Sequence, residues 1–512
     1  MLLSKLLYES GLEYDIYTQG SELLRLSAPS TDIKDIFCDS RKVVAGGLYI
    51  AIDGVHTDSH AYVAEACEHG AGAAVVSRES LLDGRVRAMD FYVPLIAVDN
   101  TREAYARLCA AWYDNPQSKL KFIGVTGTNG KTTVCSMISH VLEGAGISCG
   151  KIGTVGNVSA GQMLNIRSEN TAVNMTTPDP PELYRILDRM ARDGVRYVVM
   201  EVTSHALALF KVCPITFDVA IFTNLSEDHL DLHLNMERYF SEKAKLFAQC
   251  NKAVINVDDK YGRRLAQSIE GDVCTLSAEG RTATVCAVDV RYGVSEGTEF
   301  KLSSRKMRLR VKTVMPGSVN VMNTLCAIAA LDASGVSARE IKDSIASFGG
   351  VAGRFERLKL DPKIDFSVYI DYAHTPDALE NLLRTAKQLR KRGQRIVLVF
   401  GCGGDRDKQK RSIMGRVASE MADFVIVTSD NPRSEQPMDI INDIMSGVCD
   451  GALCTVIEDR RAAIEYALKN ARRGDIILLA GKGHEEYVID KTGRHYFSER
   501  EICRELVGKY CN

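Results

Sequence analysis

Short runs of apolar residues, each followed directly by a polar cluster, recur along the chain. The runs KFIGV, VRYVVM, DVAIF and KAVINV lead into TGTNGKT, EVTSH, TNLSEDHLD and DDK. Further on, FSVYI, RIVLVF, DFVIVT and DIILLA lead into DYAHTPD, GCGGDRD, SDNPRSE and GKGHEE. Continuous apolar runs are typical of strands buried on both faces of a parallel sheet. Ligands bind beyond the carboxyl ends of such strands, so we expect two ligand-binding α/β domains.

Other patterns extend this prediction to the rest of the chain. Apolar residues at helical spacing after Lys131 predict a helix that ends near Gly144. The stretches TATVCAVDV and RKMRLRVKTV predict an antiparallel annex to the central sheet, and GGLYIAIDG with GAAVVS predicts a small N-terminal α/β unit. The expected fold is therefore α/β in three domains, over residues 1–100, 101–350 and 351–512. The central domain has a P-loop ATPase-type sheet and the last one is Rossmann-like.

Composition narrows the class of protein. The 512 residues are 45% hydrophobic and 25% charged, with a formal net charge of −2, which offers no basic field for nucleic acid. The first apolar stretch is interrupted by Lys5 and Glu9, unlike a signal peptide or a membrane span. Fifteen cysteines without a CxxC pair indicate reduced thiols. We therefore expect a cytoplasmic monomer that acts on small molecules, with no nucleic acid partner.

The stretch GVTGTNGKTTV, at residues 124–134, predicts a phosphate-binding loop. Backbone N–H groups of a glycine-rich turn and the start of the next helix attract phosphate oxygens, Lys131 suits the outer phosphates, and the Thr132 hydroxyl suits Mg²⁺. The strict GxxxxGK[ST] pattern is not met, because Val125 stands at its first position. A plain strand-to-helix turn is the alternative. The candidate nucleotide-binding residues are Gly127, Thr128, Asn129, Gly130, Lys131, Thr132 and Thr133.

Two further strand ends carry candidate metal ligands. Glu201 in EVTSH and His229 in SEDHLD suit a hard cation near the phosphates. Taken singly, Glu201 could be an acid at a helix start and His229 a hydrogen-bonded structural histidine. Their shared placement beyond strand ends favours a metal site.

Lys243 shares a predicted helical face with Tyr239 and Phe247, at positions i, i+4 and i+8. A snorkelling side chain is the simple explanation. Burial would lower the pKa of the amine, and a neutral amine can react with CO₂ to give a carbamate, which is an anionic metal ligand. The residues alone leave both possibilities open.

The chain resembles, from end to end, the Mur ligase family of bacterial peptidoglycan synthesis. The stretches that carry the resemblance are DSRKVVAGGLYIAIDG, GVTGTNGKTT, TTPDP, MEVTSHAL, TNLSEDHLD, YFSEK, GRFERL, DYAHTPDALE, GCGGDRDKQKR, SDNPRSE and GKGHEE. The resemblance implies an N-terminal domain for the uridine nucleotide, a central one for ATP and a C-terminal one for the incoming amino acid. It also implies an ADP-forming amide ligase with ATP and Mg²⁺ as cofactors, acting through an acyl phosphate.

Site residues follow from the same resemblance. The expected catalytic residues are Lys131, Lys243, Glu201 and His229. The expected ligands of the metal ion are Thr132, Glu201, His229 and carbamylated Lys243. Ser40 is expected at the uridine end, and Thr176, Thr177, Thr203 and Lys211 at the muramoyl-peptide. Asn320, Asn323, Asp371 and His374 are expected near the nucleotide.

The stretch SDNPRSE predicts the amino acid that is added. In the family, DNPR accompanies meso-diaminopimelate, and a guanidinium such as that of Arg433 can grip the extra carboxylate that distinguishes this substrate from lysine. The other expected contacts are Arg406, Asp430, Asn431, Pro432, Gly481 and Glu485. A surface arginine after a turn proline is the alternative for Arg433.

Departures from the family pattern lie away from these motifs. Lys211 stands where arginine is usual, Leu209 replaces a polar residue, and Leu234 and Ser59 stand where glycine is usual. Three other functions stay open at this point. They are the same reaction with L-lysine, a folylpolyglutamate-synthase-like ligase, and a nucleotide-dependent switch without ligase chemistry.

Overall fold

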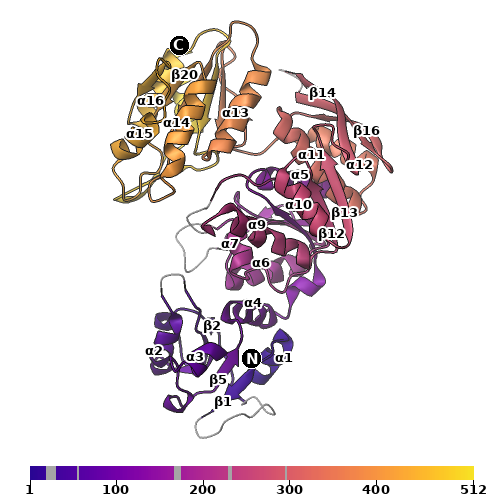
Figure 1. Cartoon of the computed structure of the whole chain (residues 1–512), viewed down its shortest axis with the longest axis vertical. Helices are drawn as coiled ribbons and strands as arrows, with labels where there is room; N and C mark the ends of the chain where they lie inside the picture. Colours follow the sequence, from indigo (N-terminus) through magenta and orange to yellow (C-terminus); the bar gives the residue numbers. More distant parts are fainter. Residues whose placement is uncertain (19–29, 55–56, 167–174, 229–232, 294–296, 512) are drawn as a thin grey trace. The chain divides into compact units, whose positions relative to one another are not determined.

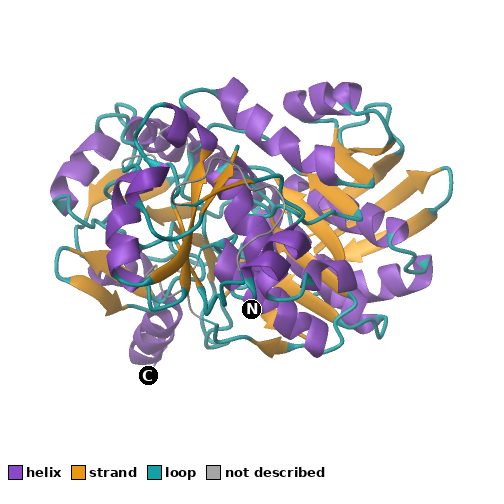
Figure 2. Cartoon of the chain, turned by 90° about the horizontal axis from the view of Figure 1, so that it is seen from below, coloured by secondary structure: helices purple, strands orange, loops and turns teal. Residues whose placement is uncertain are grey.

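The computed structural model describes residues 1–18, 30–54, 57–166, 175–228, 233–293 and 297–511. Helices and strands are mixed along the whole chain (Figure 2), which confirms the α/β class. The chain divides into two compact units. The first comprises Met1–Gly124, Ile147–Asp218 and Ala248–Asn251, and the second comprises Val125–Gly146, Val219–Phe247 and Lys252–Asn512. The domain limits near residues 100 and 350 stay a prediction.

The first unit opens with a five-stranded sheet in the order β1-β5-β4-β3-β2. Its strands are β1 (Asp15–Tyr17), β2 (Ile36–Phe37), β3 (Gly47–Ile50), β4 (Ala71–Ser77) and β5 (Leu95–Val98), and its helices are α1 (Leu3–Ser10), α2 (Val63–Glu68), α3 (Arg78–Leu82) and α4 (Thr101–Trp112). Strands β2 to β5 are parallel, and β1 is antiparallel to β5. The predicted N-terminal strands are confirmed as β3 and β4.

The rest of the first unit is built around β10, which pairs in parallel with β7. Its elements are β7 (Cys149–Ile152), β8 (Val158–Ser159), β9 (Gln162–Met163), α6 (Pro180–Arg192), β10 (Tyr197–Glu201) and α7 (Ser204–Ala208). Strand β6 (Lys121–Thr126) precedes them and passes from the first unit into the second at Val125. The polar cluster EVTSH therefore begins at the last residue of a buried strand, as predicted.

The second unit continues with four strands, β11 to β14, that pair in parallel in chain order. Its first elements are α5 (Lys131–Gly144), β11 (Val219–Phe222), α9 (Met236–Ala244), β12 (Lys252–Asn256), α10 (Lys260–Ser268), β13 (Asp272–Ser277), β14 (Val285–Gly293), β15 (Gly297–Ser304), β16 (Arg308–Thr313), α11 (Ser318–Ala333) and α12 (Ala338–Ser347). Strand β15 pairs in antiparallel fashion with both β14 and β16, which confirms the predicted annex.

The C-terminal part of the second unit, orange to yellow in Figure 1, holds a six-stranded sheet in the order β17-β18-β22-β19-β20-β21. Its strands are β17 (Glu356–Arg357), β18 (Ser367–Asp371), β19 (Ile396–Phe400), β20 (Phe424–Val427), β21 (Cys454–Val456) and β22 (Ile476–Ala480); its helices are α13 (Pro376–Leu389), α14 (Gln409–Met421), α15 (Pro437–Met445), α16 (Arg460–Lys469) and α17 (Glu499–Cys511). A hairpin of β23 (Tyr487–Asp490) and β24 (Gly493–Tyr496) follows β22. All strands of this sheet except β17 are parallel to one another. The polar clusters that follow β18, β19, β20 and β22 therefore begin at the same edge of the sheet.

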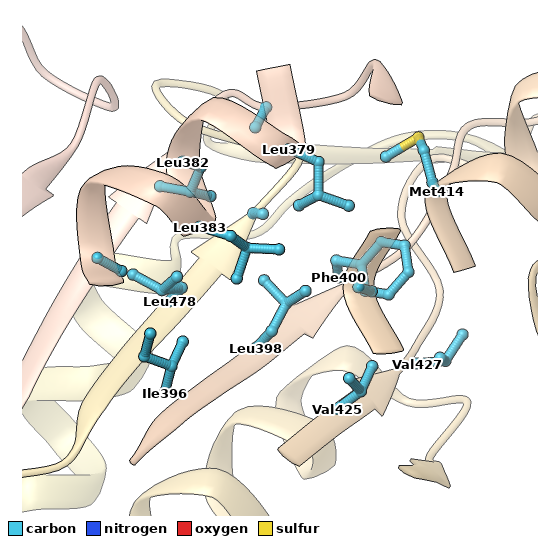
Figure 3. Close-up of a cluster of buried hydrophobic side chains, with 14 of the residues drawn as sticks. Leu379, Leu382, Leu383, Ile396, Leu398, Phe400, Met414, Val425, Val427 and Leu478 are labelled. Atoms are coloured by element: carbon cyan, nitrogen blue, oxygen red, sulfur yellow. The ribbon is translucent and has the colours of Figure 1, made fainter. Parts of the chain in front are cut away.

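Side chains along these strands alternate between two hydrophobic layers. Leu398 and Phe400 of β19 pack with Leu383 of α13 on one face (Figure 3), whereas Val397 and Val399 pack on the other face, with residues of α16 and α17. Burial on both faces explains why these strands are continuous apolar runs in the sequence.

Among the described helices, none combines the length and the apolar character needed to cross a bilayer. The fourteen cysteines whose side chains the structure describes are free thiols.

Candidate active site

The predicted phosphate loop joins β6 to α5. Gly127 and Gly130 have φ of 145° and 89°, which side chains disfavour. The end of β11 fixes the loop: Thr128 N and Asn129 N donate to the Asn224 carbonyl and Oδ1, at 3.0 and 2.9 Å. The Thr223 hydroxyl donates to the Asn129 carbonyl at 2.6 Å. Sequence reasoning missed Thr223 and Asn224 because the loop lies about 95 residues earlier in the chain.

Five other predicted nucleotide residues lie in or around this loop. Lys131 Nζ donates to the carbonyls of Gly127 and Thr128, at 2.9 and 2.8 Å, so its ammonium lies over the loop. Thr132 and Thr133 are buried in the first turn of α5. Asn323 of α11 packs directly against Gly130, where an added Cβ would stand 2.4 Å from its Oδ1, and its Nδ2 donates to Asn320 Oδ1 at 3.0 Å. The structure thus brings α11 to the phosphate loop.

Replacing Gly127 by alanine is expected to weaken ATP binding by at least about tenfold, through strain of about 1–3 kcal/mol. The new Cβ would lie 1.9 Å from Thr223 Oγ1 and 3.0 Å from the Asn224 carbonyl oxygen, so the loop would have to move. Calorimetric titration with ATP measures the change. Gly349→Ala is the matched control, since an added Cβ there meets nothing within 4 Å. Unchanged affinity in Gly127→Ala would contradict this account of the loop.

Lys243 is buried, with 2% of its surface exposed, which decides against the snorkelling side chain that the sequence left open. Its Nζ donates to the Gly127 carbonyl at 3.0 Å and lies 4.6 Å from the centre of the Tyr239 ring. Burial, followed by repulsion from Lys131, holds the pKa of Lys243 well below its usual value. A neutral amine beside the phosphate loop is the reactive form that a carbamate requires.

The predicted aromatic face around Lys243 is only partly helical. α9 ends at Ala244, and a 3₁₀ helix over Lys245–Gln249 carries Phe247, which packs against Phe222 of β11 at 6.4 Å between ring centres. The i+8 relation therefore does not describe one continuous α-helical face, because the helix changes its period after Ala244. The contact of Lys243 with Tyr239 is confirmed.

Glu201 forms a second group of predicted residues in the first unit. It is 1% exposed, and its two carboxylate oxygens accept from Thr154 N and Thr154 Oγ1 at 2.9 and 3.1 Å. Thr176 Oγ1 lies 3.1 Å from Thr154 Oγ1. Thr177 Oγ1 donates to the Glu201 carbonyl at 2.9 Å and lies 3.3 Å from Thr203 Oγ1. Four predicted residues thus meet at the end of β10, together with Thr154, which no sequence motif singled out.

Lys211 lines a cavity of about 190 Å³ in the first unit. Its Nζ pairs with Asp179 Oδ1 at 2.6 Å and lies 3.2 Å from the sulfur of Met175. Arg102 and Leu209 also line the cavity. Two cations beside a concave space suit an acidic ligand.

Three remaining positions have separate outcomes. Ser40 is buried, and its hydroxyl donates to Glu65 Oε2 at 2.5 Å. Both residues belong to the N-terminal part of the chain and make none of the contacts described above. His229 lies outside the described residues, so its role as a metal ligand stays a prediction. Leu234, at a position where glycine is usual in the family, has a φ of 63° and is 69% exposed. A left-handed conformation explains the glycine preference there.

The segment after β18 reaches the phosphate loop within the second unit. Asp377, at the start of α13, accepts from Asn129 Nδ2 at 2.7 Å and from Ser226 Oγ at 3.0 Å. Arg354 Nη2 donates to Thr132 Oγ1 at 3.2 Å. Asp371 accepts from the backbone N–H groups of Phe355 and Ala373, and burial raises its pKa.

Close by, burial lowers the pKa of His374 to about 4, and the charge of Lys410 adds to this effect. The imidazole is therefore neutral at pH 7. Its Nδ1 lies 2.8 Å from the Tyr372 carbonyl, which identifies that nitrogen as the N–H donor.

The loops after β19, β20 and β22 bring the predicted amino-acid contacts together. Asn431 Nδ2 donates to Glu485 Oε2 at 2.9 Å. Arg433 has a φ of 52°, and its Nη1 donates to the Gly404 carbonyl at 2.7 Å. An added Cβ on Gly481 would lie 2.8 Å from Asp430 Oδ2. The other two residues are Pro432, which is buried, and Arg406, which is exposed on the loop after β19.

A buried arginine that the sequence did not reveal holds two of these loops. Arg411 of α14 pairs with both carboxylate oxygens of Glu435, at 2.8 and 2.9 Å, and with Asp443 at 2.9 Å. Gly404 N donates to the Asn431 carbonyl at 2.9 Å, and an added Cβ on Gly404 would lie 2.0 Å from the Pro432 carbonyl oxygen. The two loops are therefore packed backbone to backbone.

Comparison with known proteins places the chain in a family. Three family descriptions match it: Mur ligase family, catalytic domain, over residues 32–113; Mur ligase middle domain, over 125–331; and Mur ligase, glutamate ligase domain, over 353–483.

Two curated relatives and one solved structure are similar over nearly their whole length. The curated relatives come from Caldanaerobacter subterraneus and Clostridium tetani and are 42% and 39% identical to this chain. Both are named UDP-N-acetylmuramoyl-L-alanyl-D-glutamate--2,6-diaminopimelate ligase. The alignments cover 94% and 97% of this chain and 96% and 97% of the relatives. A solved structure of an enzyme with the same name is 29% identical, covers 100% of both chains and has a TM-score of 0.67. The chain belongs to the Mur ligase family.

Proposed function

We propose that this protein is an ATP-dependent ligase that joins meso-diaminopimelate to UDP-N-acetylmuramoyl-L-alanyl-D-glutamate in the cytoplasmic synthesis of peptidoglycan precursors. The observation that carries the proposal is the presence, in one chain, of a phosphate loop beside a buried lysine with a lowered pKa and of a DNPR loop whose arginine is anchored to the Gly404 carbonyl. The relatives that are 38–42% identical over at least 93% of this chain carry the name of this activity.

The reaction has two bond-forming steps. An oxygen of the D-glutamate carboxylate attacks the γ-phosphorus of ATP, the bond to the β,γ-bridging oxygen breaks, and ADP leaves. The neutral amine of diaminopimelate then attacks the acyl carbon, inorganic phosphate leaves, and the nitrogen loses a proton as the amide forms. Phosphorylation is needed because a carboxylate is a poor acyl donor. Lys131 lowers the repulsion between the two anions in the first step.

The donor groups of three of the expected residues are of the chemical type that binds Mg²⁺. Thr132 supplies a hydroxyl, Glu201 a buried carboxylate held by Thr154, and Lys243 an amine whose neutral form can take up CO₂. Thr132, Glu201, carbamylated Lys243 and His229 would hold the metal. When bound, Mg²⁺ would neutralise phosphate charge.

The substrate roles extend this proposal over the three predicted domains. Ser40 would contact the uridine end, and Thr176, Thr177, Thr203 and Lys211 the muramoyl-peptide. Asn320, Asn323, Asp371 and His374 would lie near the nucleotide. Arg433 would bind the distal carboxylate of diaminopimelate, while Asp430, Asn431 and Glu485 would bind its amino acid head with Gly481.

Release of ADP is expected to depend on both acceptor and amine. Purified protein with ATP, Mg²⁺ and the UDP-muramoyl-dipeptide should release ADP steadily only after meso-diaminopimelate is added, and mass spectrometry should find the dipeptide lengthened by one residue. A nucleotide switch would hydrolyse ATP at one rate in both mixtures and give no new peptide. A folylpolyglutamate-type ligase would respond to a folate and glutamate instead. L-lysine in place of diaminopimelate tests the remaining alternative.

A further inference from the structure

Lys482, in the GKGHEE stretch after β22, is fully buried in the C-terminal part of the second unit. Its Nζ donates to Asn431 Oδ1 at 3.1 Å and to the Tyr487 carbonyl at 2.8 Å, and pairs with Asp430 Oδ1 at 3.1 Å. A buried ammonium is costly unless it is well paired. This one is paired with two of the residues assigned above to the amino acid, Asp430 and Asn431.

The contacts of Asn431 show what the ammonium does to its neighbour. Asn431 Oδ1 accepts from both Lys482 Nζ and Ile489 N, at 3.1 and 3.0 Å. Its Nδ2 donates to Glu485 Oε2 at 2.9 Å. Only one orientation of the amide satisfies two donors on one side and a carboxylate on the other. Lys482 therefore helps to fix which face of Asn431 points to Glu485.

Lys482 also sets the charge balance around two carboxylates. The groups that face Glu485 are Asp430, Lys482, Asn431, Tyr372, Tyr487 and Arg460. Burial and the charge of Asp430 raise the pKa of Glu485, whereas the Asn431 hydrogen bond, Lys482 and Tyr372 lower it. Burial also acts to raise the pKa of Asp430, but the charges of Lys482 and Arg460 outweigh it and leave that pKa below its usual value.

We propose that Lys482 is a positioning residue for the incoming amino acid: it orients Asn431 and places a positive charge beside Asp430 and Glu485, which favours their carboxylate forms for the substrate's ammonium group. This inference rests on the proposed function. It assigns to Lys482 no contact with the substrate and no step in bond formation.

Lys482→Met is expected to raise the KM for diaminopimelate by about ten- to a hundredfold, since charged hydrogen bonds are lost in a buried site. The KM values for ATP and the UDP-muramoyl-dipeptide should stay within about twofold, because none of the contacts described for Lys482 is with a residue assigned to the nucleotide or to the muramoyl-peptide. Lys469→Met is the matched control. It removes a lysine that is 52% exposed in an ion pair with Glu465 on α16.

The pH profile separates this role from a merely structural one. Loss of Lys482 removes an interaction that lowers the pKa of Glu485, so that pKa should rise further. Because the carboxylate binds an ammonium only when ionised, the acidic limb of kcat/KM for diaminopimelate should move to higher pH. A KM and an acidic limb that match the wild-type protein would overturn the proposal.

Lys482→Arg covers the case in which the methionine variant does not fold. Arginine keeps the charge but cannot place a compact ammonium between three oxygens. It should raise the KM for diaminopimelate with little change in the acidic limb, and an unchanged KM would again overturn the inference. Failure of the proposed function is distinguishable, since the wild-type protein would then give no diaminopimelate-dependent product.

Discussion

Ligation by Lys243→Ala is expected to fall by at least about a thousandfold, and formate or acetate should restore part of it. The amine lies in a buried position 3.0 Å from the Gly127 carbonyl, and burial keeps its pKa well below the usual value. A carbamate on this nitrogen would supply anionic oxygens beside the phosphates. A small carboxylate could enter the space left by the side chain and offer similar oxygens.

The choice of rescuing compound decides between two roles for Lys243. Methylammonium should restore activity if the lysine acts as a cation, and this result would contradict the carbamate. The activity of the wild-type protein should also fall as the pH drops through the lowered pKa, because a protonated amine cannot react with CO₂. Lys245→Ala is the matched control, since this neighbour is 45% exposed and pairs with Glu242.

Arg433→Ala is expected to raise the KM for diaminopimelate by about a hundredfold and to change the weak use of L-lysine much less. The guanidinium is anchored by Nη1 to the Gly404 carbonyl at 2.7 Å, and the Arg433 backbone N–H is held by the Ile489 carbonyl at 3.0 Å. This anchoring fixes the direction of the remaining N–H donors, which can bind a carboxylate in parallel. Lysine lacks that carboxylate and would leave the donors unpaired.

Steady-state kinetics with both amines measures this effect. Arg433→Lys serves as a charge-retaining comparison, and it should recover only part of the diaminopimelate use because it lacks the fork. A wild-type protein that uses lysine as readily as diaminopimelate would contradict the assignment of Arg433.

Patterns along the sequence identified the elements that depend on local order. The eight apolar runs became β6, β10, β11, β12, β18, β19, β20 and β22, and the helix after Lys131 ends at Gly144 as predicted. The spacing of Lys243 to Tyr239 predicted their contact but left burial of the lysine open. Strands β13 and β15 lay outside the stretches that predicted the annex, because polar residues alternate with their apolar ones and leave no continuous apolar run.

Residues that act through distant partners were not predictable in this way. Thr223 and Asn224 shape a loop about 95 residues earlier in the chain, and Thr154 holds Glu201, which is 47 residues further on. Arg411 and Lys482 stand in the GCGGDRDKQKR and GKGHEE stretches, but nothing in those stretches indicated that the two side chains are buried. Their importance arises from the meeting of loops at one sheet edge, which no local pattern specifies.

The burial of the C-terminal sheet on both faces has a consequence for how such enzymes diversify. A substitution within a strand alters one of two closely packed hydrophobic layers, so its first effect is on the stability of the fold. The loops beyond the strands lie outside these two layers, so replacing a residue such as Arg433 alters contacts to the ligand without emptying either layer. Amine preference can therefore drift between lineages while the scaffold beneath it stays constant.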